Sequence, residues 1–146
     1  MTTPLPPHTE LLRRAVLAMP MAQTLKLEFL KIVPGEVELQ IPVQEAFCFR
    51  PGQLQATAVF AAADFAAVAA AGTLLPPGGT TATIDANLKL VAPARGSHLI
   101  ARGRVVNASR LLTVCAANVF AVQDGRETLC ATLLGTAINI GTKAQS

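Results

Sequence analysis

The residue best suited to chemistry is Asp64, a carboxylate in an otherwise uncharged segment. Between Arg50 and Lys89 the only charged residues are Asp64 and Asp85. Burying a carboxylate inside an apolar helix costs free energy, and desolvation raises its pKa. Such a group can accept a proton from water or attack a carbonyl carbon. The structural alternative is that Asp64 caps a neighbouring element or pairs with a basic residue across a subunit interface.

A second candidate lies nine residues earlier, at the expected start of the same helix, where the sequence reads Gln55-Ala56-Thr57. The first amides of a helix have no partner within it and stabilise negative charge on an oxygen atom. The Gln55 side chain could add a donor or position a water molecule. Alternatively, Gln55 or Thr57 only satisfies the backbone at the helix start.

The surrounding patterns predict an α+β domain. Thr9 is expected to cap a short amphipathic helix that ends at Pro20. Apolar and polar residues alternate on either side of Pro34-Gly35, which indicates a β-hairpin. A long Ala-rich helix is expected over 56–71, ended by Gly72 and the prolines and glycines that follow. Four further strands are expected as a meander over 80–93, 98–109, 111–123 and 128–140.

The length of 146 residues fits one domain, expected over 9–141, with a flexible leader at 1–8 and a tail at 142–146. Hydrophobic residues make up 51% of the chain and charged residues only 14%. We therefore expect apolar surface to be buried between subunits of a homo-oligomer. The alternative is that alanine, which is tolerated on surfaces, inflates the hydrophobic fraction.

Several classes of protein are disfavoured. Cys48, Cys115 and Cys130 lack the spacing of a disulfide framework or a zinc site. The basic residues are scattered and Trp and Tyr are absent, unlike the pattern of nucleic-acid-binding proteins. The apolar run 54–76 has the length of a membrane span, but it is mostly alanine with Asp64 near its centre. The first residues do not have the pattern of a signal peptide. A cytoplasmic protein with no metal, no nucleic-acid partner and no membrane contact is expected.

The chain resembles the hotdog superfamily, and within it the PaaI-type and 4-hydroxybenzoyl-CoA thioesterases, from about Met21 to Ile140. LKLEFLKIVPGEVELQIPV is similar to the opening hairpin of that family and AVFAAADFAAVAAAG to its central helix. ATIDANLKLVAPARGSHLIARGRVV is similar to the next two strands, and LLTVCAANVFAVQDGRETLCATLLGTAINI to the final hairpin. The resemblance implies an antiparallel sheet wrapped around one long helix.

The resemblance also implies that Asp64 is the catalytic base or nucleophile of an acyl-CoA or aroyl-CoA thioesterase, a hydrolase. Family members commonly carry His-Gly-Gly where this chain has Gln55, Ala56 and Thr57, and neither His8 nor His98 falls there. The active site would lie between the subunits of a homodimer, alone or within a homotetramer built as a dimer of dimers. Coenzyme A would enter as part of the substrate, with no other cofactor.

Residues implied in substrate binding are less distinctive. Arg95 and Arg110, at turns, lead the candidates for the coenzyme A phosphates, followed by Lys89, Arg102 and Arg104. The competing interpretation, which is the commoner role of such residues, is that each is a solvated charge on a strand face. Cys48 and Phe49 are candidates for lining the acyl tunnel, although a buried cysteine is also typical of a protein core.

Two other functions share this fold. Loss of His-Gly-Gly favours a non-catalytic acyl-CoA or fatty-acyl binding protein. An acyl-thioester hydratase or dehydratase ranks last, because such enzymes generally need a histidine beside an acid.

Overall fold

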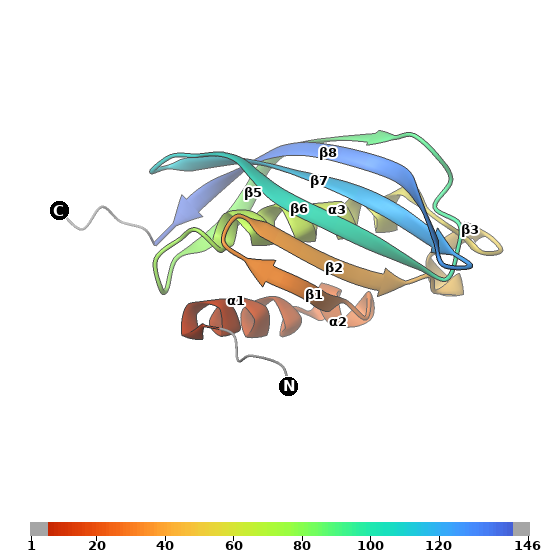
Figure 1. The fold of residues 1–146 in the computed structure, drawn as a ribbon, viewed down its shortest axis with the longest axis horizontal. Coiled ribbons are helices and arrows are strands. Elements are labelled where there is room, and N and C mark those ends of the chain that lie inside the picture. Colours follow the sequence, from red (N-terminus) through yellow and green to blue (C-terminus); the bar gives the residue numbers. More distant parts are fainter. Residues whose placement is uncertain (1–5, 142–146) are drawn as a thin grey trace.

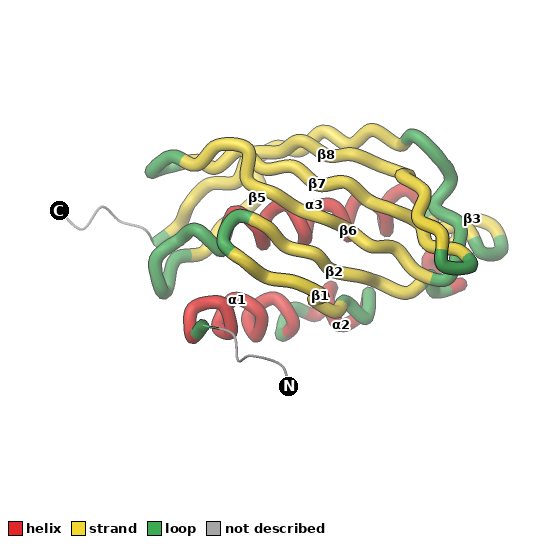
Figure 2. The backbone as a smooth tube through the Cα atoms, viewed as in Figure 1, coloured by secondary structure: helices red, strands yellow, loops and turns green. Residues whose placement is uncertain are grey.

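A six-stranded antiparallel sheet wraps around the long helix α3, and the shorter helices α1 and α2 lie beside it (Figures 1 and 2). This computed structural model describes residues 6–141. The helices are α1 (Pro7–Leu17), α2 (Pro20–Thr24) and α3 (Ala56–Gly72), with one 3₁₀ turn, η1 (Glu45–Phe47). The strands are β1 (Glu28–Val33), β2 (Glu36–Pro42), β3 (Cys48–Arg50), β4 (Gln53–Leu54), β5 (Thr80–Leu90), β6 (His98–Ala108), β7 (Leu112–Gln123) and β8 (Arg126–Ile140). The predicted α+β architecture is confirmed.

The order of the strands in the large sheet is β1-β2-β6-β7-β8-β5. The predicted hairpin is the β1–β2 pair. The predicted four-stranded meander is wrong in one respect, because β5 pairs with β8 and not with β6. After β2 the chain crosses the face of the sheet as α3 and rejoins the sheet at the opposite edge, as β5. Strand β6 therefore pairs with β2 on one side and with β7 on the other. Strand β5 is therefore an edge strand.

Small side chains let α3 lie close to the sheet. Ala62, Ala63, Ala66 and Ala67 are fully buried. At Gly103 on β6, an added Cβ atom would collide with the backbone of Ala66. The predicted all-apolar helix is thus the centre of the core, and its expected span of 56–71 is confirmed to within one residue.

The N-terminal helix differs in detail from the expectation. It begins at Pro7, with Pro6 as its N-cap, so Thr9 is not the cap but a buried residue inside the first turns. Proline fits here because the first helical N–H has no partner in any case. Pro20 ends one helix and begins the next, α2. Residues 1–5 of the expected leader and the whole of the expected tail at 142–146 lie outside the described residues.

The segment between β2 and α3 contains structure that the sequence did not predict. After η1, strands β3 and β4 form a two-stranded hairpin that turns at Gly52, whose φ of +72° suits glycine. This hairpin delivers the chain to the start of α3. Within residues 6–141 no helix has the length and apolar character needed to cross a membrane.

Candidate active site

Asp64 lies in the middle of α3, half-buried, on the side that faces β5. The Thr83 hydroxyl donates a hydrogen bond of 2.9 Å to Asp64 Oδ1. Burial raises the pKa of the Asp64 carboxyl above its ordinary value, and the Thr83 hydrogen bond opposes part of that rise. A carboxylate in this setting is a stronger base than one in water, as general-base catalysis requires.

The structural alternatives for Asp64 find no support within one chain. No ion pair joins Asp64 to a Lys, Arg or His among residues 6–141. Its hydrogen-bond partner is a strand hydroxyl and not the N–H of a helix terminus. Asp64 is therefore neither a cap nor half of an ion pair inside the subunit.

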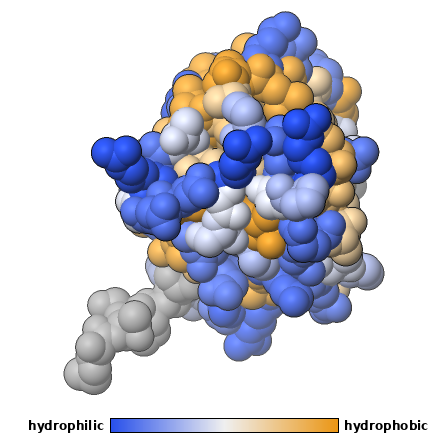
Figure 3. Space-filling model, turned by 90° about the vertical axis from the view of Figure 1, so that its right-hand side faces the viewer, coloured by the Kyte–Doolittle hydropathy of each residue, from blue (hydrophilic) through white to orange (hydrophobic). Residues whose placement is uncertain are grey.

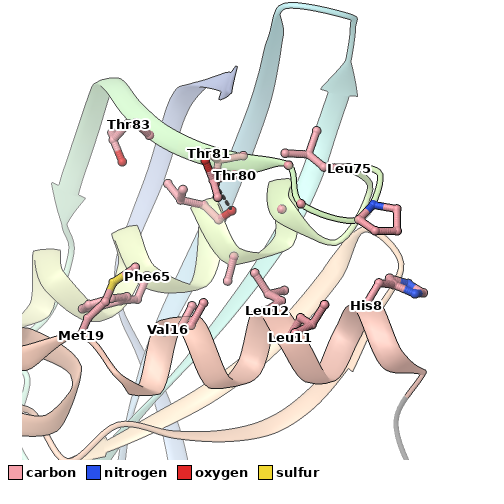
Figure 4. Close-up of a pocket in the computed structure, with 18 of the residues that line it drawn as sticks. His8, Leu11, Leu12, Val16, Met19, Phe65, Leu75, Thr80, Thr81 and Thr83 are labelled. Carbon is pink, nitrogen blue, oxygen red and sulfur yellow. Dashed lines mark hydrogen bonds between the residues drawn. The ribbon is translucent and has the colours of Figure 1, made fainter. Parts of the chain in front are cut away.

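A cavity of about 510 Å³ opens beside Asp64, between α1, α3 and the start of β5 (Figure 4). Its lining is mostly apolar, with side chains such as Leu12 and Val16 from α1 and Val68 from α3. His8 also lines it, but at the end opposite Phe65 and Thr83, so His8 is not beside the carboxylate (Figure 4). The volume lies within the usual range for small-molecule pockets.

The N-terminus of α3 is the second component. Gln55 is the N-cap residue, with an exposed side chain that makes no capping hydrogen bond. Its carbonyl accepts from the amides of Ala58 and Val59, and its own amide donates to Phe47. Within residues 6–141 the amides of Ala56 and Thr57 donate to no protein group, so they remain available to a ligand oxygen. The idea that Gln55 or Thr57 caps the helix through its side chain is therefore not supported.

These two components are far apart within a subunit. Asp64 follows Gln55 by nine residues, which is about 13 Å along a helix axis. A single carbonyl group cannot contact both the free amides and the carboxylate at that separation.

Cys48 and Phe49 lie on β3, beside the start of α3 and away from the cavity next to Asp64. The Cys48 thiol donates to the Gln44 carbonyl at 3.4 Å, and burial raises its pKa. Phe49 is 53% exposed, with the Arg50 guanidinium 4.9 Å from its ring centre. They flank the helix start, where the sequence placed them, but they do not line the cavity that holds Asp64.

The basic candidates are dispersed. Arg95 lies beside the start of α3, because its guanidinium donates to Gln53 Oε1 at 2.8 Å. Arg110 lies at the other end of the sheet, in the turn between β6 and β7, so the two leading candidates are not brought together. Lys89 is exposed on β5 and Arg104 is exposed on β6.

Arg102 is engaged in the structure. Its guanidinium bonds both carboxylate oxygens of Glu127, at 2.7 and 2.9 Å, and one oxygen of Glu38 at 3.2 Å. Of the five basic candidates, Arg95 alone is tied to the hairpin that leads into α3. Figure 3 shows that hydrophilic side chains cover much of this end of the molecule.

Sequence reasoning missed Thr83 and the contribution of α1. Thr83 lies in a threonine-rich run whose pattern predicts a strand and nothing more. Its hydrogen bond to Asp64 depends on the position of β5 at the edge of the sheet, which the pattern does not give. The apolar positions of α1 were recognisable, but not that they face α3 across a cavity.

Comparison with known proteins places these features in a family. The profile of the Thioesterase superfamily matches residues 56–128, which include α3 and Asp64. A thioesterase family protein from Silicibacter pomeroyi is 30% identical, with a TM-score of 0.87 over 90% of this chain and 97% of that one. No curated protein matches the sequence.

Two further structures share the fold at lower identity. A thioesterase from Haemophilus influenzae is 21% identical, with a TM-score of 0.79 over 99% of this chain and 96% of that one. A phenylacetic acid degradation-related protein from Ralstonia eutropha is 24% identical, with a TM-score of 0.76 over 90% and 98%. The predicted hotdog fold is confirmed. On the profile match and the 30% identity, the chain belongs to the Thioesterase superfamily.

Proposed function

We propose that the protein hydrolyses an acyl-CoA thioester at a site shared by two subunits of a homodimer. The observation that carries this proposal is the half-buried Asp64, whose pKa is raised and which opens onto an apolar cavity in a thioesterase-superfamily chain. A cavity of this kind suits the acyl group, and the carboxylate at its end suits the activation of water.

The proposed reaction needs only the residues of this chain and water. Asp64 accepts a proton from water as the water oxygen bonds to the thioester carbonyl carbon. Alternatively, the carboxylate attacks that carbon itself, and water then hydrolyses the acyl–Asp64 anhydride that is left after the thiolate departs. The amides of Ala56 and Thr57 stabilise the negative charge that develops on the carbonyl oxygen. The carbon–sulfur bond then breaks, the sulfur leaves as the coenzyme A thiolate and takes up a proton, and the acyl group leaves as a carboxylic acid.

The two-subunit site follows from the separation of about 13 Å between Asp64 and the α3 N-terminus. Strand β5 offers the route to a partner, because it is an edge strand with Ile84 54% exposed. Uncovered edges of this length favour pairing with another strand. Antiparallel pairing of β5 with its copy would run the two α3 helices in opposite directions, so that the free amides of one approach Asp64 of the other.

The test is thiol release from a panel of acyl-CoA and aroyl-CoA thioesters. Hydrolysis by the protein and its loss by at least a hundredfold in Asp64→Asn would support the proposal. Asp124→Asn is the matched control, since Asp124 lies in the exposed β7–β8 turn with a φ of +52° that Asn tolerates. If no thioester is cleaved, or if Asp64→Asn cleaves as fast as the control, the catalytic proposal fails.

A dimer test is independent of activity. Sedimentation at several concentrations should give a dimer or a dimer of dimers. Proline at Leu90, an exposed β5 residue whose N–H faces away from β8 because the neighbouring Val91 donates to Cys130, should shift it towards smaller species if β5 pairs with its copy. Monomers in the native protein would contradict the shared site.

One observation favours a binding protein as the second candidate. The α3 start has Gln55-Ala56-Thr57 and no histidine, so the carbonyl receives no imidazole donor there. Asp64→Asn separates the two candidates. An enzyme loses turnover and still binds the thioester, whereas a binding protein has no turnover in either form.

We further propose a cytoplasmic location. Cys48, Cys115 and Cys130 are all free thiols. A reducing compartment keeps thiols in this state.

A further inference from the structure

We propose that the cavity beside Asp64 is an elongated acyl channel that selects unbranched acyl chains of about eight to twelve carbons over aromatic groups. This inference rests on the proposed function, and it names the substrate class of that same site.

The channel runs along the two helices. From α3 it is lined by Asp64, Phe65, Val68, Ala69 and Gly72, which at this spacing form one stripe of the helix. The α1 lining residues recur every three or four positions from His8 to Met19 and form a facing stripe. Figure 4 shows Met19, Phe65 and Thr83 at one end and His8 and Leu75 at the other. The space between two such stripes therefore follows the length of the two helices.

The helix geometry gives the length of the channel. Gly72 follows Asp64 by eight residues, which corresponds to about 12 Å along the axis. An extended chain advances about 1.2 Å per bond, so about ten carbon atoms reach from the carboxylate to Gly72. A single aromatic ring fills only the part of the channel nearest Asp64 and leaves the remainder without an apolar occupant.

The walls converge at Gly72. A Cβ atom added there would lie 3.1 Å from Leu12 Cδ1 on α1 and 3.8 Å from Thr81 Oγ1 on β5. Beyond this point the segment from Leu75 to Gly79 completes the lining. Gly72 therefore marks a constriction before the far end of the channel, and any side chain at this position shortens the space that a chain can enter.

The experiment measures kcat/KM for straight-chain acyl-CoA thioesters from two to sixteen carbons, with benzoyl-CoA and phenylacetyl-CoA alongside. We expect kcat/KM to rise about fourfold per methylene up to about ten carbons and then to fall. Ala69→Leu and Gly72→Leu should both move the optimum to shorter chains, and Ala69→Leu should move it further because Ala69 is nearer to Asp64. Ala18→Leu is the matched control. Ala18 is exposed and does not line the channel, so the same added volume lies outside it.

Leu12→Ala tests for a longer channel. It removes side-chain volume, whereas Ala69→Leu and Gly72→Leu add volume in a packed region. It removes the α1 wall at Gly72, so the optimum should move to longer chains. A flat chain-length series, an aromatic thioester as the best substrate, or an optimum unmoved by folded Ala69→Leu and Leu12→Ala would overturn the channel proposal.

A binding assay separates failure of the channel from failure of the proposed function. The chain has no Trp or Tyr, so the fluorescence of bound cis-parinaric acid can be followed with little protein background. Displacement by fatty acids should be tightest near ten carbons and should shift in the variants as kcat/KM does. If displacement follows this pattern while no thioester is cleaved, the channel stands and the enzyme proposal fails. If thioesters are cleaved but fatty acids of all lengths displace equally, the channel proposal fails.

Discussion

The Thr83 hydroxyl donates a 2.9 Å hydrogen bond to Asp64 Oδ1, which joins the middle of α3 to edge strand β5. This bond orients the carboxylate towards β5 at the edge of the sheet. It also stabilises the charged form of Asp64 against the desolvation that disfavours it. One hydroxyl thus acts on both the position and the protonation of the candidate base.

Replacing Thr83 with Val should shift the pH dependence of activity. Val preserves the shape of Thr but removes the donor, so the carboxylate loses the interaction that lowers its pKa. The pKa of Asp64 then rises further, and the acidic limb of the kcat/KM profile moves to higher pH. Thr83→Ser retains the hydroxyl and should keep the native profile. A profile in Thr83→Val that matches the native one would show that the bond does not tune the base.

Asp64→Asn should stabilise the fold more at neutral pH than at acidic pH. The folded pKa of Asp64 lies above its unfolded value, so the group's favourable contribution exists below the unfolded pKa and is lost as pH rises through the folded pKa. Asn does not titrate and avoids that loss. Urea unfolding at pH 7.5 and near pH 4 measures the effect, with Asp124→Asn as the control. A variant whose relative stability falls as pH rises would contradict the pKa direction.

The chain pattern predicted the elements well because their signals are local. The all-apolar helix around Asp64 and the β1–β2 hairpin at Pro34-Gly35 depend on periodicity and turn residues within each segment. The pairing of β5 with β8 does not, since it depends on where the chain emerges after α3. The four-stranded meander was wrong for this reason.

The candidate site was predictable only in part. Asp64 and the start of α3 stand out because a charge and a helix start are visible along the chain. Thr83 and Gly72 acquire their roles from contacts with distant segments, at separations of 19 residues to Asp64 and 60 residues to Leu12. Arg95 and Arg110 looked equivalent as turn residues, and the fold alone separates them to opposite ends of the sheet.

Gly103→Ala should destabilise the protein strongly, by about 3 kcal/mol or more. The added methyl group would collide with the backbone of Ala66, which cannot move without shifting α3 away from β6. Gly135→Ala on β8 is a milder comparison, because the nearest atom there is the Asp85 carbonyl oxygen at 3.0 Å. Urea midpoints of both variants measure the difference. Equal stability of Gly103→Ala and the native protein would mean that α3 does not approach the sheet at this point.

Arg95→Ala should weaken recognition of the coenzyme A part of the substrate. Arg95 lies beside the free amides of α3, where its guanidinium can exchange the Gln53 side chain for a phosphate. We expect KM for an acyl-CoA to rise about tenfold, a change of about 1.4 kcal/mol, with little change for the matching acyl-N-acetylcysteamine, which has no phosphate. Arg110→Ala, at the other end of the sheet, is the control within the same subunit and should leave both values unchanged. If Arg95 only holds the β3–β4 hairpin in place through Gln53, both thioesters will lose activity to the same extent, and the phosphate role is excluded.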